Sequence, residues 1–139
     1  MYLLDTNVIS EFRKAGTSKI DRQVRAWTKT VPNSALFLSV ISILELETGI
    51  LLMERRDRRQ AMVLREWMEE HVLPVFADRI LPIDTAIARR CAAFHVPNRC
   101  ADRDAMIAAT ALLHGMTVVT RNVRDFAPTR VPVFNPWEA

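Results

Sequence analysis

Four widely separated positions carry acidic or amide side chains that suit the binding of a metal ion. They follow short β-branched or leucine-rich runs, or lie in the helical patterns after such runs: Asp5, Glu45, Asp104, and the pair Asn122 and Asp125. If the runs are parallel strands, their carboxyl ends meet at one edge of a sheet and bring these oxygen atoms together. Hard divalent cations such as Mg²⁺ prefer oxygen ligands. The sequence therefore predicts a cation site assembled from distant segments.

The elements that would position these residues alternate between strand and helix patterns. Apolar runs predict strands at residues 1–4, 36–40, 80–83, 118–119 and 131–134. Helical periodicity predicts helices at residues 8–13, 20–30, 42–56, 58–75, 84–94 and 103–114. Because parallel neighbours need crossovers of helical length, this order indicates an α/β fold. We expect a three-layer α/β/α domain, with a central parallel sheet of about five short strands.

Length and composition restrict the class of protein. The 139 residues fit a single domain, 1–139, and a hydrophobic content of 50% argues against disorder. The net charge of +3 permits a polyanionic partner without requiring one. The two cysteines show neither CxxC spacing nor a disulfide framework, which fits a reducing, cytoplasmic location. No run approaches the length of a membrane span, so we expect no membrane partner.

Two of the acids also have a purely structural interpretation. Asp5 would cap a helix that begins near Val8, since aspartate is a favoured N-cap residue. Asp104 would lie in the first turn of its helix, where the helix dipole favours an acid. Asp84 follows a strand as Asp5 does, and we interpret it as a cap, so position after a strand does not by itself identify a metal ligand.

Glu45 is harder to explain by structure alone. Its predicted helix places it on an apolar stripe with Ile41 and Leu52, where an unpaired carboxylate is costly to bury. Glu47 remains an alternative, because the side of the helix that carries it is apolar too.

The motifs that contain these acids resemble those of a known nuclease family. MYLLDTNVISE at residues 1–11, Glu45-Leu46 with Gly49, DAMIAATA at 104–111, and VTRN at 119–122 with Asp125-Phe126 are similar in order and spacing to the motif series of PIN-domain ribonucleases. Within that superfamily the chain resembles VapC-type toxins. Its ending, VFNPW at 133–137, is similar to the FitB branch.

The resemblance implies a metal-dependent endoribonuclease, with Mg²⁺ or Mn²⁺ as cofactor, that is the toxic component of a type II toxin–antitoxin pair. Its partners would be an RNA substrate and a VapB-like antitoxin. The family also implies a homodimer, which assembles with the antitoxin into a larger complex that binds operator DNA through the antitoxin. A metal-activated water would hydrolyse the phosphodiester bond.

The resemblance also assigns roles to the acids. Asp5, Glu45 and Asp104 match the most regular acidic positions of the family and are the expected metal ligands and catalytic residues. Asn122 stands where some relatives carry an aspartate, and an amide brings no charge. Asp125 is therefore the expected fourth catalytic acid, and Asn122 is expected to orient a metal-bound water or the substrate.

Hydroxyl and basic side chains next to these acids are the expected substrate-binding groups. Thr6 and Thr120 are expected to support the carboxylates by hydrogen bonds, and Thr6 also to lie beside the substrate. Arg121 and Arg124 flank the fourth motif and would bind RNA phosphates.

Two other functions remain possible on the sequence. An aspartyl-phosphate phosphatase of the haloacid-dehalogenase kind would also place an aspartate after its first strand, but it needs a second acid two residues later, where this chain has Asn7. A PIN-fold binding module that has lost activity through Asn122 is the other alternative. Replacement of Asp5 would abolish the activity of a nuclease but leave the function of such a binding module intact.

Overall fold

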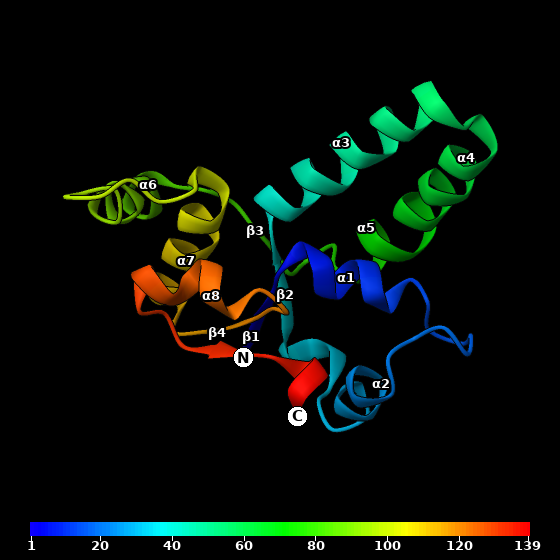
Figure 1. The fold of residues 1–139 in the computed structure, drawn as a ribbon, viewed down its shortest axis with the longest axis horizontal. Coiled ribbons are helices and arrows are strands. Elements are labelled where there is room, and N and C mark those ends of the chain that lie inside the picture. Colours follow the sequence, from blue (N-terminus) through cyan, green and yellow to red (C-terminus); the bar gives the residue numbers. More distant parts are fainter.

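The computed structural model describes all 139 residues and shows a five-stranded parallel sheet between helices (Figure 1). The strands are β1 (Tyr2–Leu4), β2 (Leu36–Ser39), β3 (Ile80–Leu81), β4 (Thr117–Val119) and β5 (Val133–Phe134). They lie in the order β3-β2-β1-β4-β5, and every neighbouring pair is parallel. The predicted α/β class and parallel sheet are confirmed.

The helices agree with the predicted positions, with small shifts at their ends. They are α1 (Thr6–Phe12), α2 (Arg22–Thr28), α3 (Val40–Arg56), α4 (Arg58–Trp67), α5 (Leu73–Val75), α6 (Thr85–Ala93), α7 (Asp102–His114) and α8 (Val123–Phe126). A π-helical turn, η2 (Met68–Val72), joins α4 to α5, so the predicted helix at 58–75 is nearly continuous. Short 3₁₀ turns are η1 (Asn33–Ala35), η3 (Ala127–Thr129) and η4 (Pro136–Glu138). We did not predict α8, because its four residues are too few to show helical periodicity.

The central strand β1 contributes a residue to each face of the sheet. Leu3 packs in one apolar cluster with Ile107 and Ala108 of α7. Leu4, the next residue, packs in another with Val8 of α1 and other apolar residues. Successive side chains on a strand point to opposite faces, so β1 lies between two helical layers. The end of β1 therefore opens at the middle of the sheet edge, where Asp5 follows.

Helix ends are fixed largely by the residues that the sequence indicated. Asp84 accepts a hydrogen bond from the Ile87 N–H at 2.9 Å and caps α6, as predicted. Gly115 ends α7 with φ +66°, a backbone conformation that costs glycine little because it has no Cβ.

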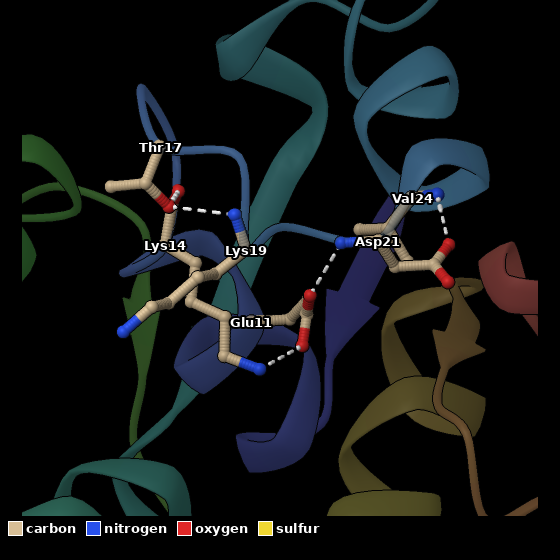
Figure 2. A network of polar contacts seen from close by, with 6 residues as sticks. All are labelled: Glu11, Lys14, Thr17, Lys19, Asp21 and Val24. Atoms are coloured by element: carbon tan, nitrogen blue, oxygen red, sulfur yellow. Dashed lines mark hydrogen bonds and ion pairs between the residues drawn. The ribbon is translucent and has the colours of Figure 1, made fainter.

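A polar network joins the end of α1 to the start of α2 (Figure 2). Glu11, of which only 7% is exposed, accepts through its side chain from Lys14 Nζ at 3.0 Å and from the Asp21 N–H at 2.7 Å. Asp21 in turn accepts from the Val24 N–H at 3.0 Å and caps α2. Both oxygens of this buried carboxylate are therefore paired. Glu11 belongs to the first sequence motif, but its contacts hold a loop in place.

One prediction about α3 is wrong. Leu52 is 60% exposed, so it does not share a buried stripe with Glu45. The buried residues of α3 are Ile41, Ser42, Leu46 and Ile50. The second half of α3 extends beyond the sheet alongside α4, so its outer residues have no layer to cover them (Figure 1). None of the helices is both long and apolar enough to cross a membrane.

Candidate active site

Asp5 is held in one orientation at the end of β1. Its Oδ1 accepts from the Thr6 N–H at 2.9 Å, and its Oδ2 accepts from Thr120 Oγ1 at 2.8 Å and Asn7 Nδ2 at 3.3 Å. The first of these bonds makes Asp5 the N-cap of α1, so the structural interpretation is confirmed. Capping uses one oxygen and does not exclude chemistry at the other.

Burial raises the pKa of Asp5 above its usual value. The hydrogen bonds from Thr120 and from the Thr6 backbone lower it in part, and the charges of Glu45 and Asp125 raise it again. Only 6% of the residue is exposed, so water screens these charges poorly. The Asp5 carboxylate therefore lies in the negative electrostatic field of Glu45 and Asp125.

Glu45 faces the same site from α3. Its Oε1 accepts from Thr6 Oγ1 at 2.8 Å, and its Oε2 lies 3.7 Å from Arg103 Nη1. Glu47, the alternative, instead forms a bidentate ion pair with Arg65 of α4, with N–O distances of 2.7 and 2.5 Å. The hydrogen bond from Arg65 lowers the pKa of Glu47. The two glutamates therefore point to different neighbours, and only Glu45 approaches the other acids.

Asp104 joins the site from the first turn of α7, where the sequence predicted it. Burial, followed by the charges of Asp5, Asp125 and Glu45, raises its pKa to about 6. Since all three charges act on Asp104, the structure brings together the four acids that the sequence predicted. Like charges in one site oppose full ionisation unless a cation neutralises them.

The acids fit a divalent cation but do not form a complete cage for one. No three His, Cys, Asp or Glu side chains converge into a ready ligand set. Mg²⁺ typically takes one or two protein carboxylates directly and keeps several waters, so a full set is not required. Burial and, after it, mutual repulsion raise the pKa values of Asp5 and Asp104, and a bound cation would favour their charged forms.

The predicted amide, Asn122, lies at the start of α8, and its expected role toward a metal-bound water or the substrate stays a prediction. Its backbone N–H donates to Thr120 Oγ1 at 2.9 Å, and its exposed side chain makes no capping hydrogen bond. Asn7 also orients the site, because its amide donates to Asp5 Oδ2 and Thr120 Oγ1, and its Oδ1 accepts from the Arg121 N–H at 3.2 Å. The spacing Asp-Thr-Asn at the end of the first strand was the signal for Asn7 that our sequence reasoning missed.

The two basic residues of the fourth motif are both exposed. Arg121 places its guanidinium 5.2 Å from the ring centroid of Trp137 in η4, and this cation–π contact connects the fourth motif to the C-terminal turn. Arg124 is exposed on α8, next to Asp125 in sequence. Arg103 was not predicted to lie at the site, because sequence alone does not show that it reaches Glu45 on a different helix.

Comparison with known proteins identifies the family. Residues 2–130 match the PIN domain family. The chain belongs to the PIN-domain family. Among similar proteins, Toxin FitB of Neisseria gonorrhoeae is 39% identical over 99% of both chains. VapC ribonuclease Y4jK of Sinorhizobium fredii is 37% identical, also over 99% of both chains.

A solved structure supports the same assignment for this PIN domain. A chain in the structure of FitAB bound to a DNA fragment superposes with a TM-score of 0.86 and 39% identity, over 99% of this chain and 96% of that one. The resemblance to PIN-domain proteins of the VapC and FitB type, first indicated by four short motifs, is confirmed over the whole chain.

Proposed function

We propose that this PIN domain is a metal-dependent endoribonuclease and the toxin of a VapBC-like toxin–antitoxin system. The observation that carries the proposal is that four acids, from the end of β1 and from α3, α7 and α8, act on one another. Burial, and then the charges of the other three acids, raises the pKa of Asp104 to about 6. Such crowding disfavours stability and is typical of a site built for a cation. The similarity to a protein named a VapC ribonuclease supplies the substrate class.

We assign Asp5, Glu45 and Asp104 as the residues that hold Mg²⁺ or Mn²⁺, and Asp125 as the fourth catalytic acid. The bound ion would lower the pKa of a water and neutralise charge on the phosphodiester. Thr120 and Asn7 fix the Asp5 carboxylate by donating to its Oδ2, and Thr6 fixes Glu45. These bonds orient the carboxylates before any ligand arrives, which reduces the cost of reorganisation during the reaction.

We assign Arg121 and Arg124 to the RNA phosphates, since both are exposed and carry the opposite charge to the substrate. Thr6 and Asn122 are proposed to lie along the same path. For Asn122 this leaves its side chain available to the substrate, because only its backbone is engaged within the chain.

The proposed partner is a VapB-like antitoxin. The similar chain in FitAB is seen in a complex bound to DNA, which supports an assembly that reaches operator DNA through the antitoxin. We also propose that the toxin is a homodimer within that assembly, in the cytoplasm.

Cleavage of a mixed tRNA, rRNA and mRNA panel by the antitoxin-free chain tests the proposal. We expect cleavage with Mg²⁺ or Mn²⁺, none with EDTA, and loss of cleavage in Asp5→Asn and Asp104→Asn. Glu45→Gln and Glu47→Gln form a matched pair on one helix, of which only the first should inactivate. Cleavage that persists in the Asp5 and Asp104 variants would contradict the assigned site. RNA binding without cleavage in any metal would favour the inactive binding module.

A further inference from the structure

A pocket adjoins the acids on the side of the loop between α6 and α7. It has a volume of about 550 Å³, and both Asp104 and Asp125 line it. A larger hollow of about 1170 Å³ lies between α3 and α4, but none of the site acids lines that one. A ligand in the smaller pocket would therefore contact the catalytic carboxylates, and the volume lies within the range common for small-ligand sites.

The side chains of this pocket combine three kinds of contact. Apolar surface comes from Val96, Pro97 and Pro128, and Val96 is 75% exposed. Arg124 lines the pocket and takes part in none of the ion pairs of the chain. Asn98 adds an amide that both donates and accepts hydrogen bonds. An apolar face, an amide and a cation are the groups that bind the ring, the edge and the phosphate of a nucleotide.

The wall of the pocket is held in shape by its own hydrogen bonds. The Cys100 N–H donates to His95 Nδ1 at 3.1 Å, Cys100 Sγ donates to the Phe94 carbonyl at 3.0 Å, and Arg99 pairs with Asp102 at 3.3 Å. Asn98 takes no part in these bonds. The loop is thus ordered before a ligand binds, while its amide stays available, and such preorganisation lowers the cost of binding.

We propose that this pocket receives the nucleobase that adjoins the scissile phosphate of single-stranded RNA, so that Asn98 and Val96 determine the nucleotide preference of cleavage. The inference rests on the proposed ribonuclease function. In this arrangement Val96 contacts the base face, Asn98 hydrogen-bonds the base edge, and Arg124 holds the adjoining phosphate. The carboxylates of Asp104 and Asp125, which line the same pocket, then lie next to the phosphodiester bond that is cut.

The first test maps cleavage of a randomised single-stranded RNA pool by sequencing the product ends. We expect the wild-type protein to prefer particular nucleotides beside the cut, and Asn98→Ala and Val96→Ser to change that preference by about fivefold or more. Asn33→Ala and Val75→Ser are matched controls, because both residues are exposed and line no part of this pocket. Their profiles should equal that of the wild type.

If Asn98 and Val96 had a merely structural role, their substitution would lower cleavage equally at all sites and leave the nucleotide preference unchanged. That result for both Asn98→Ala and Val96→Ser overturns the proposal. A wild-type profile with no preference beside the cut overturns it as well.

The second test does not depend on catalysis, because Cys100 lines the pocket and reports on its occupancy. Alkylation of Cys100 by iodoacetamide is followed by mass spectrometry in the Asp5→Asn variant, with Mg²⁺ and with or without short single-stranded RNA. Cys91 is an internal reference, since it is buried and burial raises the pKa of its thiol. We expect RNA to slow alkylation of Cys100 by about fivefold or more, with Cys91 unaffected.

The two tests separate the pocket from the proposed function. Protection of Cys100 together with a wild-type protein that cuts no RNA would reject the ribonuclease while supporting the pocket as an RNA site. Cleavage without protection, and with unchanged preference in the variants, would reject the pocket and leave the ribonuclease. Protection by a peptide from the antitoxin but not by RNA would show that the occupant is protein, and overturns the proposal.

Discussion

Replacement of Asp104 by asparagine should stabilise the metal-free protein at neutral pH while abolishing its activity. Folding raises the pKa of this carboxyl from 3.8 to about 6, so the folded state prefers the protonated form. The shift of about two units corresponds to about 3 kcal/mol. Because Asp104 is only partly buried, solvent screening reduces this value. We therefore expect Asp104→Asn to raise the free energy of unfolding by about 1–3 kcal/mol at pH 7.5.

The effect of Asp104→Asn on the free energy of unfolding depends on pH. A carboxyl whose folded pKa is raised favours folding below its unfolded pKa, near 3.8, and loses that contribution as the pH rises through about 6. Asparagine does not ionise and keeps the contribution at every pH. The stability difference between variant and wild type should therefore be small at pH 4, grow between about pH 4 and 6, and change little above about pH 7.

Thermal and urea unfolding in EDTA, measured across this pH range, provide the assay. For a chain of this length, about 1–3 kcal/mol corresponds to a Tm increase of about 3–10 °C. Asp102→Asn is the matched control on the same turn of α7, because the Asp102 side chain is 60% exposed and pairs with Arg99 and His95. We expect it to be neutral or slightly destabilising. A difference for Asp104→Asn that is absent at pH 7.5, or equal at pH 4 and 7.5, would refute the assigned crowding.

Three further substitutions test other contacts of the site. Arg103→Gln removes the only cation paired with Glu45, which competes with a metal ion for that carboxylate. Calorimetry should show Mn²⁺ binding that is tighter by about two- to fivefold. An unchanged affinity would show that the Arg103–Glu45 pair does not oppose metal binding. Thr120→Val removes a hydrogen-bond donor from the buried Asp5 carboxylate, and urea unfolding should show a loss of about 1–3 kcal/mol; a negligible loss would contradict the role of this bond. Glu47→Gln should cost about 0.3–1 kcal/mol through its lost ion pair and leave RNA cleavage intact, so an inactive variant would place Glu47 in the site.

Local patterns in the sequence were sufficient to predict most elements of the fold. Apolar runs located all five strands, and Asp84 and Gly115 marked the ends of helices as predicted. These features depend on residues close together in the chain, whose periodicity and backbone preferences are visible without tertiary structure. The helix α8 was missed because four residues show no period.

Contacts between distant segments were harder to predict. Whether Glu45 or Glu47 belongs to the site depends on which neighbour each side of α3 faces. Only the packing of α3 beside α4 shows that Glu47 pairs with Arg65. The exposure of Leu52 has the same origin, since α3 extends beyond the sheet. Periodicity identifies a face of a helix but not the neighbour that the face will meet.

The sequence by itself determined the α/β class, the identities of the acids and their place after strands or in the helices that follow them, because these follow from short-range patterns and residue chemistry. The tertiary structure decided which groups act on those acids. It brought Asn7 to Asp5 and Thr120, placed Arg103 beside Glu45, and raised the pKa of Asp104 to about 6. The physical reason is that hydrogen bonds, desolvation and charge interactions depend on distances between atoms that are remote in the chain, and only folding sets those distances.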